Sequence, residues 1–365
     1  MARGNRALGL KTYAAHLYND CHKALLLKTA HDELTRALND DIEPHARNGF
    51  TQALDEIKDT LHPEYLASTT TPDDTPHGTT TNEQTYRHRL LRARLFLNPL
   101  NDLGPHPNAA QDTLTTPPII VTPGTGPTHQ GAMNQLKQEY IAARYFYDQG
   151  TQQRTQPHYA DKDVTLTDTL DYPAYGIRLE YLRAAFRLAY SLLDKTAYFL
   201  NDYLNLGIRE DRVNFRTLWY LNNEQRRGLR HDLERRENLP LRALYWLAKD
   251  LAPHEHAIGT LNPDAQHLAL IRNHLEHKFL KLHTEGFQGP TPTHATGDLA
   301  DTLPLHLHAH TFQNKCLQLL RLTRAAIIYL SLSIHREERE RAKTRPPDQR
   351  VARINLYPLP EHRRQ

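Results

Sequence analysis

Three features of the sequence predict an all-α protein, an antiparallel helical bundle with an N-terminal helical extension. Apolar residues recur every three or four positions over long stretches in both halves of the chain. With 39% apolar residues and only 16 glycines in 365 positions, the composition suits a packed helical core. Segments rich in Thr and Pro separate these stretches, so the helices are expected to be joined by loops.

The first third of the chain is expected to precede the bundle. Helical spacing from Leu8 to about Leu38 and again from His45 to Leu61 predicts a helical hairpin in residues 1–67. Residues 68–85, STTTPDDTPHGTTTNEQT, offer no apolar face and predict a flexible linker. In residues 86–130 we expect a connecting helix from Tyr86 to Phe96, then a Pro-rich loop with one short strand at Ile119–Val121.

Residues 131–345 are predicted to form the bundle, and residues 346–365 a C-terminal tail. Apolar periodicity places helices at about 132–148, 175–206, 240–251, 263–283 and 312–343. Gly207 offers a C-cap for the second of these helices, and Asn262-Pro263-Asp264 is a strong start signal for the fourth. The connecting stretch LPLHLHAHTF is interpreted as loop.

Charge and cysteine usage limit the classes of function. With 45 basic and 42 acidic residues the net charge is +3, so the chain lacks the strong positive field of a dedicated duplex-binding protein. Cys21 and Cys316 have no CxxC spacing, which favours a reducing, cytoplasmic compartment. The N-terminus has no apolar signal region, and the run Ala325–Ile334 is too short to span a bilayer, so no membrane partner is expected.

The segment IRNHLEHKFLKLH contains the strongest candidate for a catalytic site. Arg272 and His277 form an R-x4-H pair, and Asn273 lies one helical turn before His277. The same helix carries a packing stripe that would hold these polar groups on a rigid element, formed by Leu268, Ile271, Leu275, Phe279 and Leu282. The alternative is an ordinary ion pair of Arg272 with Glu276 and a structural role for His277.

A second R-x4-H pair, Arg226 and His231, lies in NNEQRRGLRHDLERREN. This stretch is polar, contains Gly228 and lacks an apolar face, so it is expected to be loop or solvated helix. The spacing alone is therefore weak, and the setting of each pair has to decide between them.

Cleavage of RNA without a metal needs a base for the 2′-OH, an acid for the departing 5′ oxygen and a cation for the phosphorane. His277 and Arg272 have the required chemistry. Supporting or RNA-binding candidates are Asp194, Lys195, Asn201, Glu276 and Lys278. Asp194 or Asn201 could orient the catalytic pair from the neighbouring helix, or could serve only as a structural partner or cap. Arg183 and Arg187 could contact phosphate or merely coat the surface.

The 23 histidines also raise the question of a metal site. Those near the R-x4-H pair, and those that alternate further on, are His254, His256, His267, His274, His277, His283, His306, His308 and His310. None of them has HExxH or finger spacing, and alternating histidines share a face only on a strand, whereas their surroundings are interpreted as loop. The prediction is therefore no metal and no cofactor.

Four ordered blocks resemble one bacterial branch of the HEPN superfamily. They are RLFLNPLNDL (94–103), NQLKQEYIAARYFY (134–147), LLDKTAYFLNDYLNLGI (192–208) and RNHLEHKFLKLH (272–283). The resemblance implies a HEPN-type bundle that dimerises with its two signature helices facing each other around an RNA cleft. It further implies a metal-independent endoribonuclease of toxin–antitoxin or anti-phage systems that leaves a 2′,3′-cyclic phosphate. Arg272 and His277 would be catalytic and Asn273 would assist.

The sequence thus favours a homodimeric cytoplasmic RNase, a toxin or antiviral effector restrained by an antitoxin or regulatory protein. Two other hypotheses remain at this point. One is a non-catalytic helical module that binds RNA or protein, which the resemblance allows because some HEPN domains are inactive. The other is a metal-dependent hydrolase that uses the histidines.

Overall fold

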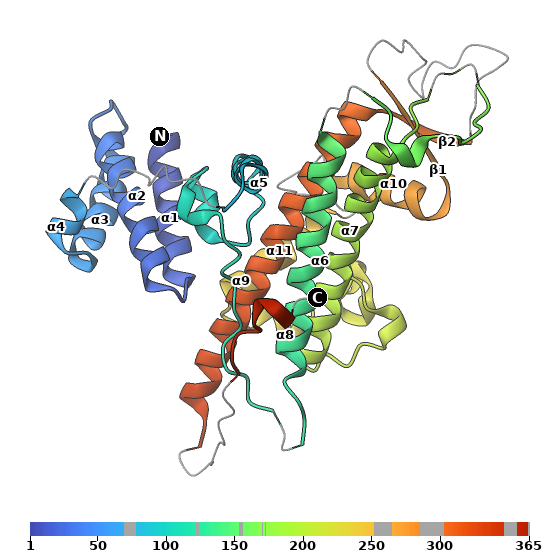
Figure 1. Cartoon of the computed structure of the whole chain (residues 1–365). Coiled ribbons are helices and arrows are strands. Elements are labelled where there is room, and N and C mark those ends of the chain that lie inside the picture. The colour runs from blue at the N-terminus through green and yellow to red at the C-terminus, as the bar shows by residue number, and fades with distance from the viewer. Residues whose placement is uncertain are drawn as a thin grey trace.

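The computed structural model describes residues 1–68, 78–121, 124–152, 156–169, 171, 173–251, 265–284, 303–346 and 356–363. Within these ranges the regular secondary structure is helical apart from a two-stranded parallel sheet and one isolated bridge (Figure 1). The all-α prediction is therefore confirmed. Short 3₁₀ turns lie at Pro99–Leu103, Pro107–Ala109, Tyr159–Asp161, Glu210–Arg212, Leu221–Asn223, Gln225–Arg227 and Glu361–Arg363.

Three long helices form the centre of the bundle: α6 (Thr128–Thr151), α7 (Ile177–Tyr203) and α11 (Ala309–Thr344). They run side by side, with α9 (Leu239–Asp250) packed on α11 and α10 (Ala265–His277) packed on α7 (Figure 1). Phe186 of α7 stacks on Phe312 of α11 with ring centroids 5.7 Å apart. Burying such a side chain contributes about 1.5–3 kcal/mol, so the apolar stripes explain the assembly.

By length and composition α11 is the one helix in the described residues that could cross a membrane. However, 72% of its apolar window is buried inside the protein. The side chains of this window pack on α6, α7 and α9, and this burial is that of a core helix.

The N-terminal extension differs from the predicted hairpin. It contains α1 (Ala2–His16), α2 (Asp20–Leu38), α3 (Pro44–Thr60) and the short α4 (Pro63–Ala67). The run expected to be continuous from Leu8 to Leu38 breaks before Asn19, whose side chain accepts a hydrogen bond from the His22 amide at 3.0 Å. Asn19 is an N-cap, and such a cap starts a new helix within an apolar pattern that otherwise continues.

The connecting helix α5 (Thr81–Ala93) begins earlier than the predicted Tyr86. The Thr80 hydroxyl accepts from the Glu83 amide, and the Glu83 carboxylate accepts from the Thr79 amide at 2.9 Å, which resembles a capping box shifted by one residue. The end of the predicted linker is therefore helical, while residues 69–77 lie outside the described residues. Residues 119–121 have no strand pairing, so the strand expected there is not found.

Buried arginines hold the Pro-rich segment against the bundle. Arg144 of α6 makes two hydrogen bonds of 2.6 Å to the Asp112 carboxylate. Arg324 of α11 contacts Asp102 Oδ1 at 2.6 Å and donates to the Asn98 carbonyl at 2.6 Å. Both arginines are almost fully buried, and loss of one partner from a buried ion pair typically costs about 3–5 kcal/mol.

Two helix ends are corrected by the structure. The second bundle helix, expected to run to Leu206 and to stop at Gly207, ends at Tyr203, because Asn205 already has a left-handed backbone with φ of 52°. The helix expected at 263–283 is α10, which ends at His277. The predicted cap Asn262-Pro263-Asp264 lies outside the described residues.

A parallel sheet replaces the last turns of the predicted fourth helix. β1 (Phe279–His283) pairs in parallel with β2 (Pro304–His308), in the stretch that was interpreted as loop. Leu280 and Leu282 alternate into the core, and the Ala174 amide donates to the Leu282 carbonyl at 2.7 Å. Pairing with distant segments thus overrides a local pattern that suits a helix equally well.

Candidate active site

The core-facing side of α10 fixes the orientation of the R-x4-H pair. Leu268, Ile271 and Leu275 are buried, and the helix packs on α7. Arg272 is consequently half-buried, while Asn273 and His277 are exposed. Asn273 and His277, one turn apart, lie on the same side of the helix. The three polar groups are thus held on a rigid element at the protein surface.

Arg272 is directed toward α7. Its Cζ atom lies 5.6 Å from the ring centroid of Tyr190, which is a cation–π contact. Asp194, one turn further along α7, accepts a hydrogen bond of 3.0 Å from the Phe215 amide. Burial raises the pKa of Asp194, and the Phe215 amide together with the positive charges of Arg272 and Arg216 offsets part of this rise. Tyr190 and Asp194 therefore form the side of the site opposite α10.

Two further arginines on this face of α7 contact the last turn of α10 and the strand β1 that follows it. Arg187 donates to the Leu275 carbonyl at 2.6 Å, and Arg183 donates to the Leu280 carbonyl at 3.0 Å. Carbonyls in the last turn of a helix lack partners within the helix, so Arg187 serves as a C-cap. Each guanidinium carries five N–H donors, and each also pairs with a carboxylate, Arg183 with Glu180 and Arg187 with Glu276.

Glu276 does not occupy the position that the ion-pair alternative requires. Its carboxylate lies 3.6 Å from the Arg187 Nε, so it pairs with α7, while Arg272 faces the Tyr190 ring. Lys278 is exposed directly after His277. Both residues are thus neighbours of the R-x4-H pair.

Two of the candidate residues lie elsewhere. Lys195 pairs with Glu139 of α6 at 2.6 Å, and Asn201 hydrogen-bonds the backbone N–H and C=O of Ile208. Lys195 therefore ties two bundle helices together, and Asn201 closes the turn after α7. Conversely, Tyr190 and Arg216 were not among the expected residues. Tyr190 continues the spacing of Arg183 and Arg187 on α7, which is a usable signal, whereas Arg216 follows the helix in a loop and has none.

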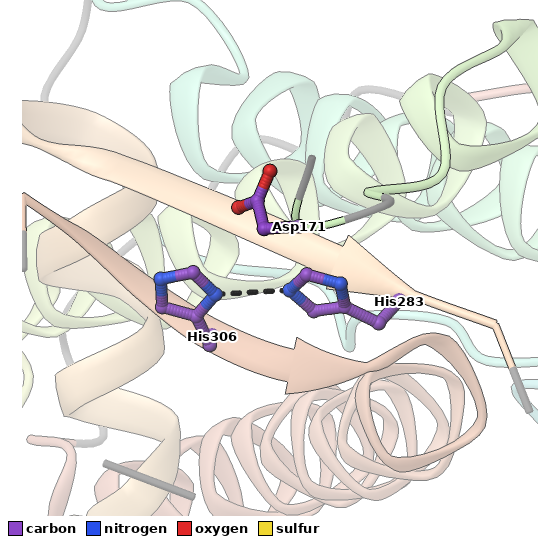
Figure 2. Close-up of side chains that lie close together, drawn as sticks. All are labelled: Asp171, His283 and His306. Carbon is purple, nitrogen blue, oxygen red and sulfur yellow. Dashed lines mark hydrogen bonds between the residues drawn. The ribbon is translucent and has the colours of Figure 1, made fainter. Parts of the chain in front are cut away.

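A second cluster lies at the sheet and could hold a metal ion. The ligand atoms of Asp171, His283 and His306 all lie within 4.8 Å of one another (Figure 2). His283 Nε2 and His306 Nδ1 are 2.9 Å apart, and the Lys281 ammonium lies 2.7 Å from Asp171. Burial acts to raise the pKa of Asp171, but hydrogen bonds from Lys281 and Thr169 outweigh it and keep this pKa below its usual value. The expectation of no metal site depended on a loop at 304–308, and that segment is a strand.

A family model described as LA2681-like HEPN matches residues 120–337. The match covers more than half of the chain and contains α6, α7, α9, α10 and most of α11. No curated protein and no solved structure matches the chain.

Proposed function

Because this chain belongs to the LA2681-like HEPN family, we propose that it is a metal-independent endoribonuclease whose active site is built from Arg272, Asn273 and His277. One observation carries the proposal. Arg272 lies on α10, a helix anchored in the core, where its guanidinium is over the Tyr190 ring and interacts electrostatically with Asp194. His277 is exposed on the same helix, one turn beyond Asn273. A site held in this way has the preorganisation that catalysis needs.

Each residue has a role in transesterification. One imidazole takes the proton of the 2′-OH, whose oxygen attacks the phosphorus, and an imidazolium protonates the 5′ oxygen as its bond to phosphorus breaks. The Arg272 guanidinium stabilises the negative charge of the phosphorane, and Asn273 donates to a phosphate oxygen. The products are a 2′,3′-cyclic phosphate and a 5′-OH. Lys278 and Arg187, whose side chain is 45% exposed, would attract the RNA backbone locally despite the nearly neutral net charge.

The two proton transfers call for two histidines in opposite protonation states, and one copy of the chain contributes one His277. A two-fold axis beside α10 would bring in the second. Exposed apolar residues on α10 and at the start of β1 support this arrangement. Leu270 of α10 and Phe279, the first residue of β1, are 46% and 62% exposed. The proposed enzyme is therefore a homodimer with facing α10 helices.

An RNase of this kind endangers the cell that makes it. We therefore assign it to the class of toxins or anti-phage effectors, acting on RNA in the cytoplasm under an antitoxin or regulatory protein. Induction in a bacterial host should arrest growth for the wild type and not for His277→Ala at equal protein level. Equal arrest by both proteins would contradict this assignment.

The direct test is cleavage of total cellular RNA by the purified chain in EDTA, followed by analysis of the product ends. We expect 2′,3′-cyclic phosphate ends with the wild type and no cleavage with folded His277→Ala. Cleavage by both proteins at the same rate would overturn the proposal. RNA binding by both without cleavage would favour the alternative, a non-catalytic binding module.

A further inference from the structure

Three segments distant in sequence meet at one end of the small sheet (Figure 2). Asp171 lies on the segment before α7, His283 ends β1, and His306 is in the middle of β2. The parallel register places Lys281 opposite His306 and His283 opposite His308, so the two histidines of the cluster are on the same face. On the other face, Leu280 and Leu282 fill the core.

The donor atoms are those that late first-row divalent metals prefer. Two imidazole nitrogens and one carboxylate oxygen lie within 4.8 Å of one another, and His283 is only 2% exposed. We propose that Asp171, His283 and His306 bind a divalent cation of the Zn²⁺ type. Among the described residues the site has three protein ligands, which leaves a fourth tetrahedral position that water could take. The site is separate from Arg272 and His277, and the proposal does not depend on RNA cleavage.

Binding an ion requires the two rings to rearrange. With Zn–N bonds of about 2.0–2.1 Å, two tetrahedral ligand nitrogens lie about 3.3 Å apart. His283 Nε2 and His306 Nδ1 are 2.9 Å apart and face each other in a hydrogen bond, so the rings need to separate by a few tenths of an ångström and to turn until both lone pairs point at the ion. The ring that donates in this hydrogen bond must move its proton to its other nitrogen, because metal-binding nitrogens are deprotonated.

Lys281 would compete with the metal ion for the Asp171 carboxylate. Its ammonium lies 2.7 Å from the Asp171 carboxylate and neutralises it in the metal-free chain. The cation would take the place of the ammonium as counter-ion. The Asp171 carboxylate can thus pair with either the Lys281 ammonium or the metal ion. Removal of Lys281 should therefore strengthen metal binding, whereas removal of a ligand should weaken it.

Metal binding would also stabilise the surroundings of α10. β1 begins two residues after His277, and the Arg183 guanidinium bonds the Leu280 carbonyl within it. An ion that joins β1, β2 and the segment before α7 would therefore restrain the exit of α10. Since the ion binds only the folded chain, it should raise the melting temperature in a concentration-dependent way.

The experiment is a titration of the chelator-stripped, full-length chain with Co²⁺. We expect one equivalent to produce the visible absorption of four-coordinate Co²⁺, and one equivalent of Zn²⁺ to abolish it. His306→Ala and Asp171→Asn should lower the affinity at least about a hundredfold, since even residues that only support metal ligands contribute about 10- to 100-fold. His310→Ala, an exposed histidine on α11, should bind like the wild type.

Lys281→Met provides a test of opposite sign. We expect its affinity for Co²⁺ to rise about tenfold, because one competing positive charge beside the carboxylate is gone. Circular dichroism and the melting temperature of each metal-free variant identify any loss of fold. No stoichiometric Co²⁺ spectrum for the wild type, or an unchanged spectrum in folded His306→Ala, would overturn the proposal. If the chain binds Co²⁺ as expected but does not cleave RNA, the result contradicts only the proposed RNase site on α10 and leaves the metal site supported.

Discussion

The chain contains two R-x4-H pairs, and their surroundings differ in almost every respect. Arg272 and His277 lie on a helix of 13 residues with a buried apolar side. Arg226 lies on the 3₁₀ turn Gln225–Arg227, and His231 begins the four-residue helix α8 (His231–Glu234). Since no single helix carries both members of the second pair, its spacing does not place them together.

The charged partners of the two arginine–histidine pairs also differ. The Arg226 side chain is 79% exposed and pairs with Glu224 at 3.0 Å, and His231 lies 3.6 Å from Glu234. Each member of this pair thus has a carboxylate beside it that comes from a neighbour in sequence. Arg272 instead lies over the Tyr190 ring with Asp194 nearby on another helix. The comparison teaches that a motif of this length becomes informative only when tertiary contacts from a second element orient it.

The largest expected difference between the two pairs concerns the histidines. His277→Ala should lower RNA cleavage by roughly 10²- to 10⁴-fold, the usual contribution of a positioned acid or base, and His231→Ala should leave it unchanged. Initial cleavage rates on one RNA substrate measure both variants. Because both positions are exposed, equal melting temperatures are expected and serve as the folding control. A comparable loss in His231→Ala would remove the distinction between the pairs.

The arginines should follow the same pattern with a smaller effect. Arg272→Ala should cost roughly 10²- to 10³-fold in kcat, the range for loss of one preorganised group that stabilises transition-state charge. Arg272→Lys should recover only part of the activity, because an ammonium cannot replace a planar guanidinium over the Tyr190 ring. Arg226→Ala, measured in parallel, should behave like the wild type. Full activity of Arg272→Ala would exclude a catalytic role for this side chain.

The exposed apolar residues beside the first pair give a third difference. Leu270→Glu should convert a dimer into a monomer and lower cleavage roughly a hundredfold, because the second histidine is lost. Leu239→Glu is the matched control, since Leu239 at the start of α9 is also 46% exposed and a glutamate there suits the helix N-terminus. Light scattering reports the mass of each variant. A monomeric wild type with full activity would contradict the facing arrangement of the α10 helices.

Local sequence patterns predicted the bundle well, because each long helix carries its own apolar stripe. The stripes of α6, α7 and α11 are visible within the segments that form them. The break at Asn19 also had a local signal, an Asn-Asp pair in the middle of an apolar run. The sheet had no such signal. β1 and β2 pair only because two segments about 25 residues apart meet, and their sequences suit helix or loop equally well.

In the candidate sites, too, some residues could be predicted from local sequence and others depend on tertiary packing. Arg272, Asn273 and His277 could be predicted because their relation is set by one helix. That Asp194 lies beside Arg272 whereas Asn201 closes the turn after α7 depends on how α7 packs, and spacing does not encode it. The cluster of Asp171, His283 and His306 was missed for the same physical reason, because its members come from three segments.

The smallest expected difference concerns the carboxylates that face the two arginines. Asp194→Asn should lower cleavage by roughly tenfold or less, because it weakens the positioning of Arg272 without touching the substrate.

Asp194→Asn should also raise the melting temperature near neutral pH. The pKa of Asp194 is raised in the folded chain, so its ionised form costs stability above this pKa, and the cost disappears below about pH 4, where the group is protonated in both states. Glu224→Gln, beside Arg226, should leave cleavage unchanged. Its effect on stability should have the opposite sign, because hydrogen bonds from Arg227 and Arg226 lower the pKa of Glu224 and its ionised form therefore stabilises the folded chain near neutral pH. Melting curves of the wild type and Asp194→Asn from pH 4 to pH 8 measure the effect, and a stability difference that shrinks as pH rises would show that the Asp194 charge stabilises the fold.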